Sequence, residues 1–148
     1  MKLKLLAIGN VLMEDDGIAV ILAEKLREEL ESLGLSVIIG ETDSDYLLSA
    51  IDEEDTLIIL DAVTMVPCGE ILCLSLREAV PVYRDETQHS LSFLHTCRLY
   101  YPDIRGILLG IGVESCGYHY GVSERLSERI GEVKKILLQR IIDYIQGL

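Results

Sequence analysis

Two aspartates and one histidine stand out in the chain because each comes next to a predicted strand end. Asp16 lies in the turn after a first apolar strand, Asp61 ends the apolar run TLIILD, and His89 lies in the polar segment DETQHS, immediately before a predicted helix. The carboxyl ends of parallel strands meet at one edge of a sheet, where ligand crevices form. Two carboxylates and an imidazole are a mixed oxygen and nitrogen donor set for a divalent metal, with positions left for water or a substrate ligand.

Ordinary structural roles account for the same three residues. An aspartate at the end of a strand is often a turn or cap residue, and Asp16 could be the N-cap of the helix that follows Gly17. His89 could cap the next helix or be exposed. Four further titratable residues are expected to lie outside the site: Glu14 and Asp15 as solvated side chains, His95 and His119 as structural ones.

Alternating strand and helix patterns define the expected fold. Strands are predicted at residues 3–8, 35–40, 56–61, 69–76 and 106–113, and helices at 18–33, about 45–51, 90–101 and from an N-cap at Ser127 almost to the end. The runs at 56–61 and 106–113 are continuously apolar, which is typical of strands covered on both faces of a parallel sheet. We expect a three-layer α/β/α sandwich with a central, mostly parallel, twisted five-stranded sheet, and one antiparallel or mixed pairing near 69–76.

Length and composition limit the class of protein. A chain of 148 residues is expected to form a single domain, residues 1–148. Its net charge of −12 and lack of a basic run argue against nucleic-acid binding. No apolar run is long enough for a membrane span and no leader pattern is present, so we expect a cytoplasmic protein. The four cysteines, without CxxC spacing, are expected to be free thiols.

Several other catalytic patterns do not occur. The sequence contains no GxSxG nucleophile elbow, no Walker P-loop and no GxGxxG after the first strand. None of the cysteines lies at an evident electropositive turn, which a thiolate nucleophile needs. The chain therefore offers no dedicated nucleophile, and this favours attack by water over an acyl-enzyme.

Four short motifs, taken in order, resemble those of the hydrogenase maturation endopeptidases. They are GNVLMEDDG near the start, LDAV after the third strand, the His89 segment, and GIGVES before the last helix. The pattern GN-x-L-x-x-D-[DE]-G of that family is matched here by the following residues: Gly9, Asn10, Leu12, Asp15, Asp16 and Gly17.

The resemblance implies a function and a set of site residues. It implies an endopeptidase that removes a C-terminal peptide from the precursor of a [NiFe]-hydrogenase large subunit. The family's two metal-binding carboxylates fall on Asp16 and Asp61, and its histidine ligand on His89. These residues would engage nickel that the substrate already carries, so that nickel is a transient recognition element and not a resident cofactor. The expected partner is the precursor, and the oligomeric state is left open with a monomer favoured.

Two departures from the family leave alternatives open. Residues 41–44 read Glu-Thr-Asp-Ser where the family often has a Gly-Thr-x-Gly turn, and Gly112-Val113-Glu114 replaces its usual Gln-Pro. The changed loop could alter substrate selectivity. A non-cleaving nickel-dependent assembly chaperone is one alternative. Another hydrolase of similar fold, such as a peptidyl-tRNA hydrolase, is a second, although the acidic chain shows little sign of a basic groove for tRNA.

Overall fold

A computed structural model describes residues 2–12, 14–83, 88–114 and 122–148, with the side chains of residues 14, 80–83 and 88–92 outside the description. In this part of the chain one sheet has the strand order β2-β1-β3-β5-β4, and β4 alone runs antiparallel to its neighbour. The expected mostly parallel sheet and its antiparallel pairing are confirmed. The strands are β1 (Leu3–Ile8), β2 (Leu35–Glu41), β3 (Thr56–Val63), β4 (Ile71–Ser75) and β5 (Arg105–Gly112).

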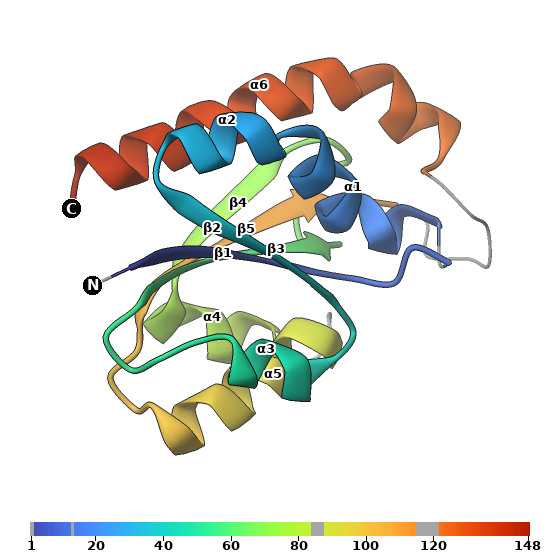
Figure 1. Cartoon of the computed structure of the whole chain (residues 1–148). Helices are drawn as coiled ribbons and strands as arrows, with labels where there is room; N and C mark the ends of the chain where they lie inside the picture. Colours follow the sequence, from blue (N-terminus) through green and yellow to red (C-terminus); the bar gives the residue numbers. More distant parts are fainter. Residues whose placement is uncertain (1, 13, 84–87, 115–121) are drawn as a thin grey trace.

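Helices cover both faces of this sheet and complete the predicted three-layer sandwich (Figure 1). A 3₁₀ turn, η1 (Glu14–Gly17), leads from β1 into the first of them. One layer consists of α1 (Ile18–Lys25), α2 (Arg27–Ser32) and α6 (Glu124–Gln146). The other consists of α3 (Ser44–Ser49), α4 (Leu76–Tyr83) and α5 (Gln88–Tyr100).

The central strand β3 divides the hydrophobic core in two. All eight of its residues are buried, as expected for a strand covered on both faces. Successive side chains of a strand point to opposite faces. Ile58 and Leu60 accordingly pack with the α1, α2 and α6 layer, and Leu57 and Ile59 pack with the α3, α4 and α5 layer.

The first and the last predicted helix differ from the structure. The helix expected over 18–33 is divided at Leu26, although its apolar stripe continues because Leu22, Leu26 and Leu30 are all buried. The prediction of Ser127 as the last N-cap is wrong. Ser123 has that role, since its Oγ accepts a hydrogen bond from the backbone N–H of Leu126.

Helix α4 was not predicted. The strand expected over 69–76 is β4, which ends at Ser75, and Leu76 begins α4 instead of ending the strand. Leu76 and Ala79 are both buried in the core on the α5 side. The largely apolar segment 71–76 therefore contains the whole of β4 and the first residue of α4, and hydrophobic periodicity alone does not mark the boundary between them.

The structure also bears on the predictions about the cysteines and about membrane-spanning segments. Cys68 and Cys97 are buried and Cys73 is exposed, all three with free thiols as expected, while Cys116 lies outside the described residues. Within the described ranges, no helix is both long and apolar enough to cross a membrane.

Candidate active site

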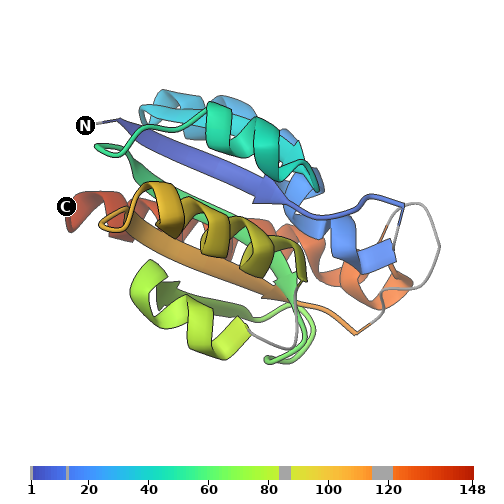
Figure 2. The ribbon, with the colours of Figure 1, turned by 90° about the horizontal axis from the view of Figure 1, so that it is seen from below.

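The carboxyl edge of the parallel strands is where the sequence places its candidate site, and strand register shows how that edge is built. The pairing of β1 with β3 extends to Ala7 and Leu60, whereas β3 continues to Val63, beside Gly112 of β5. Strand β3 therefore projects beyond the end of β1. The chain after β1 folds into η1, which packs against β3 at this edge. In Figure 2 the arrows of β1, β3 and β5 point toward the same end of the molecule.

Asp16 is held in η1 by the turn that follows β1. Its Oδ2 accepts a hydrogen bond from the backbone N–H of Asn10 at 2.9 Å, and Asn10 Oδ1 accepts one from the backbone N–H of Leu12 at 2.9 Å. Gly9 has φ +146°, and a Cβ there would lie 2.1 Å from the backbone oxygen of Asp16. The turn can close over itself only because Gly9 has no side chain. The Gly-Asn pair thus orients the half-buried carboxylate of Asp16.

Asp61 is fully buried near the end of β3. Its Oδ1 accepts a hydrogen bond from the backbone N–H of Ala62 at 2.8 Å. Since Leu60 and Ala62 pack toward α1 and α6, strand alternation directs Asp61 to the opposite layer, which contains α5. A carboxylate removed from water interacts more strongly with a nearby cation than an exposed one does, because the local dielectric constant is lower.

His89 lies in the first turn of α5, which begins at Gln88 and not at residue 90 as predicted. Helix α5 leads into β5 and runs back along it, so that its first turn lies at the carboxyl edge (Figure 2). This first turn of α5 also lies on the face of the sheet toward which the Asp61 side chain is directed. The structure therefore brings the backbone of His89 to the edge that carries Asp16 and Asp61, while its imidazole is outside the description.

Asp15 has a role that the sequence analysis did not predict. It was expected to be solvated, and this expectation is wrong because its exposed fraction is 0 %. Its Oδ1 accepts a hydrogen bond from the backbone N–H of Ser123 at 2.6 Å, and its Oδ2 accepts one from Ser123 Oγ at 2.8 Å. Asp15 thus joins η1 to the N-cap of α6. The sequence signal for this contact is a serine directly before a glutamate at a helix start, and Ser123 shares that signal with Ser127.

The other titratable residues of the sequence analysis lie elsewhere. His95 is an exposed residue of α5, two turns beyond His89. The side chain of Glu14 and all of His119 are outside the described residues. Nothing in the structure brings His95 to the carboxyl edge.

The loop after β3 forms one wall of this edge and is fixed by hydrogen bonds. The backbone N–H of Gly112 donates to the carbonyl of Glu70 at 2.8 Å. A Cβ at Gly112 would lie 2.0 Å from the backbone oxygen of Pro67, so the glycine of the GIGVES motif permits this approach. From α6, the guanidinium of Arg129 donates to the carbonyl of Cys68. The loop is therefore held from both β5 and α6.

Cys68 is the cysteine of this loop, and its surroundings disfavour a thiolate. Burial raises the pKa of the Cys68 thiol above its ordinary value, and the negative charges of Asp15 and Glu114 raise it further. A nucleophilic cysteine needs the opposite environment. This agrees with the absence of a nucleophile pattern in the sequence.

Among the side chains that the structure describes, no group of three or more His, Cys, Asp and Glu residues could hold a metal ion. The imidazole of His89 is not among the described side chains, so this finding does not include it. Asp16 and Asp61 are the described members of the predicted ligand set.

The fold is an α/β/α sandwich whose candidate site lies at the carboxyl ends of the parallel strands. Comparisons with known proteins identify the class of protein. Residues 20–140 match the family model described as hydrogenase maturation protease. The chain is similar to the solved [NiFe] hydrogenase maturation protease HybD from Thermococcus kodakarensis, with 21% identity, a TM-score of 0.76, and 94% of this chain and 98% of that one covered. No functionally curated protein sequence matches it.

Two structures from Escherichia coli are similar over comparable lengths. The hydrogenase maturating endopeptidase HybD has 23% identity and a TM-score of 0.76, with 97% of this chain and 94% of that one covered. The endopeptidase HycI has 25% identity and a TM-score of 0.73, with 95% and 88% covered. The chain belongs to the hydrogenase maturation protease family. The matched segment includes Asp61 and His89 and begins four residues after Asp16.

Proposed function

We propose that this protein is an endopeptidase that removes a C-terminal peptide from the nickel-loaded precursor of a [NiFe]-hydrogenase large subunit. Family membership supports a maturation protease. The observation that carries the choice of site is the arrangement at the carboxyl edge. There the buried Asp61 near the end of β3, the oriented Asp16 in η1 and the first turn of α5 with His89 occupy one edge of the sheet.

The proposed site residues engage the nickel that the precursor carries. Carboxylate oxygens and an imidazole nitrogen are suitable donors for a divalent first-row metal. The hydrogen bond from Asn10 orients the Asp16 carboxylate, and burial keeps water from competing at Asp61. Three donors from the protease leave positions for ligands that the substrate contributes. The protease would thus bind the metal only together with the precursor, and cleavage would depend on nickel insertion.

Water is the proposed nucleophile, and two ways of activating it remain compatible with the site. In one, nickel polarises the scissile carbonyl or lowers the pKa of a bound water. In the other, Asp16 or Asp61 acts as general base and nickel only positions the bond. In both, the raised pKa of Cys68 argues against a competing thiolate mechanism.

The test is the mass of a hydrogenase large-subunit precursor, with and without nickel, after incubation with purified protein. We expect loss of a C-terminal peptide only from the nickel-loaded precursor. Asp16→Asn, Asp61→Asn and His89→Ala should each abolish processing while the far-UV circular dichroism spectrum is unchanged. His95→Ala, on the same helix, and Asp52→Asn, an exposed residue before β3, are matched controls that should process normally.

Each outcome distinguishes the proposal from its alternatives. Normal processing by all three site variants would exclude the assigned residues. Stable binding of the nickel-loaded precursor with no change in its mass would instead indicate a non-cleaving assembly chaperone. Processing of the nickel-free precursor at an equal rate would contradict the role proposed for the metal.

A further inference from the structure

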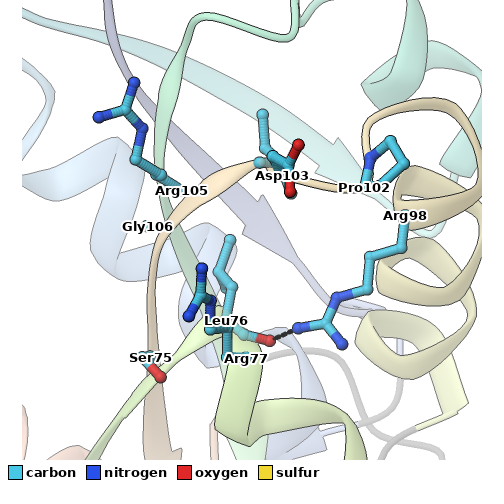
Figure 3. A pocket seen from close by; sticks show the side chains of 9 residues that line it. Ser75, Leu76, Arg77, Arg98, Pro102, Asp103, Arg105 and Gly106 are labelled. Carbon is cyan, nitrogen blue, oxygen red and sulfur yellow. Dashed lines mark hydrogen bonds between the residues drawn. The ribbon is translucent and has the colours of Figure 1, made fainter.

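A hollow of about 490 Å³ lies at the edge of the sheet opposite the candidate active site. It lies between the start of α4, the last turn of α5 and the start of β5 (Figure 3). Strand β5 begins there at Arg105 and ends at the carboxyl edge at Gly112, so the length of the strand separates the two places. The proposed peptidase site therefore does not use this hollow.

Three arginines line the hollow, each from a different element. Arg77 comes from the first turn of α4, Arg98 from α5 and Arg105 from the start of β5. The chain as a whole has 13 Lys and Arg against 25 Asp and Glu residues, so three arginines around one hollow reverse its general charge. No described carboxylate forms an ion pair with any of the three. Asp103 is the acidic residue in its described lining, and Glu53 and Glu54 line an adjoining hollow that shares Arg77 and Arg105.

Arg98 is held in place by the protein itself. Its guanidinium donates a hydrogen bond to the backbone carbonyl of Leu76, and the side chain is half-buried. Figure 3 shows it reaching from α5 toward the start of α4. A guanidinium has five N–H donors, so this single bond orients the group without using most of its donors. Orientation before binding lowers the entropy that a ligand must overcome.

We propose that this hollow binds an oxyanion, a phosphate or carboxylate group, through the guanidinium groups of Arg77, Arg98 and Arg105. The planar fork of an arginine matches two oxygens of either group and forms charge-assisted hydrogen bonds. The net charge of −12 repels anions at long range, so binding depends on these short contacts. The volume falls in the range of small-ligand sites and also admits acidic side chains of another protein.

Isothermal titration calorimetry at low ionic strength tests the proposal with three probes: pyrophosphate, citrate and a blocked tri-glutamate peptide. The double variant Arg77→Gln/Arg105→Gln should weaken binding at least tenfold, because it removes two exposed guanidiniums from the lining of the hollow. Asp103→Asn should tighten binding, since it removes the lining carboxylate. Arg140→Gln, which removes an exposed charge from α6, is the matched control and should bind as the wild type does.

The probes also distinguish the two sources of the oxyanion. Preference for pyrophosphate or citrate indicates a small anion, and preference for the peptide indicates an acidic protein segment. Absence of binding by all three at millimolar concentration would overturn the proposal. Binding that the double variant leaves unchanged would overturn it equally. No hydrogenase precursor is needed, so the result is independent of the proposed peptidase function.

Discussion

Replacing Asp15 by alanine should destabilise the fold strongly, although Asp15 lies in an acidic stretch of sequence of the kind usually found exposed at a protein surface. The fully buried carboxylate accepts two hydrogen bonds from Ser123, at 2.6 and 2.8 Å, across 108 residues of sequence. It joins the turn that holds Asp16 to the first turn of α6. The substitution removes both bonds and leaves the backbone N–H of Ser123 without this acceptor.

The magnitude follows from the two bonds. A hydrogen bond to a charged group contributes about 1.5–3 kcal/mol. Ser123 is only half-buried, so water can replace part of the loss, and we expect a total cost of about 3 kcal/mol. For a domain of this size that corresponds to a decrease of about 6–12 °C in the melting temperature. Asp15→Asn keeps one acceptor oxygen and should cost about half as much.

Urea unfolding followed by far-UV circular dichroism measures this cost, because the chain has no tryptophan. Ser123→Ala removes its hydroxyl bond to Asp15 and the cap on Leu126, and should cost about 1–2 kcal/mol. The double variant should lose less than the sum of the two single changes by about 1 kcal/mol, since both remove the same bond. Asp52→Ala, an exposed carboxylate, is the control and should change the stability by less than about 0.5 kcal/mol.

Two results would refute this reasoning. The first is a melting temperature for Asp15→Ala within about 1 °C of the wild type, which would place the carboxylate in solvent. The second is strict additivity of the Asp15 and Ser123 substitutions, which would show that the two side chains do not stabilise the fold through each other.

Three further predictions concern a buried ion pair, a glycine and a thiol. Lys4 Nζ lies 2.7 Å from the Asp55 carboxylate. Burial by itself would raise the pKa of Asp55, but the hydrogen bond and charge of Lys4 and the hydrogen bond from the Asp52 backbone N–H outweigh burial, so the pKa of Asp55 is lowered. The stability that Asp55 contributes is therefore present above its ordinary pKa and lost as the pH falls through the lower folded value. Lys4→Met should cost about 3 kcal/mol near pH 7 and progressively less below about pH 4 in urea unfolding, and a pH-independent difference would contradict this. Gly106→Ala should cost at least about 2 kcal/mol in the same assay, because φ is +149° and the new Cβ would meet the Leu57 carbonyl oxygen at 2.0 Å; a neutral effect would refute the strain. Burial raises the pKa of Cys97 to about 11. Peptide mapping should therefore find Cys97 unalkylated by iodoacetamide at pH 8 in the native protein and alkylated in guanidinium, whereas rapid labelling of the native protein would disprove its burial.

The sequence supports prediction of the fold because its signals are local. The continuous apolar runs at 56–61 and 106–113 predict two-sided burial, and β3 is buried along its whole length. The short connection before residue 69 predicts one antiparallel or mixed pairing near 69–76, and the structure has it between β4 and β5. Helix α4 escaped prediction because Leu72, Leu74 and Leu76 continue the alternation of a strand across its start. The signal for the helix is Ser75, whose Oγ accepts a hydrogen bond from the backbone N–H of Glu78 at 3.4 Å. The N-cap of α6 was misplaced because a serine one turn later, Ser127, has the same local pattern.

The sequence by itself determined the fold class, the edge at which polar residues gather, and the identity of the candidate residues Asp16, Asp61 and His89. Each of these depends on residue type, spacing and strand ends, which neighbours along the chain specify. Only the tertiary structure decided which carboxylates are buried and what holds them. Asp15 and Asp16 are adjacent and chemically identical, yet Asp15 bonds Ser123, 108 residues away, and Asp16 bonds the nearby turn at Asn10. Burial and long-range hydrogen bonds depend on what the fold packs against a side chain, and the local sequence carries no record of it.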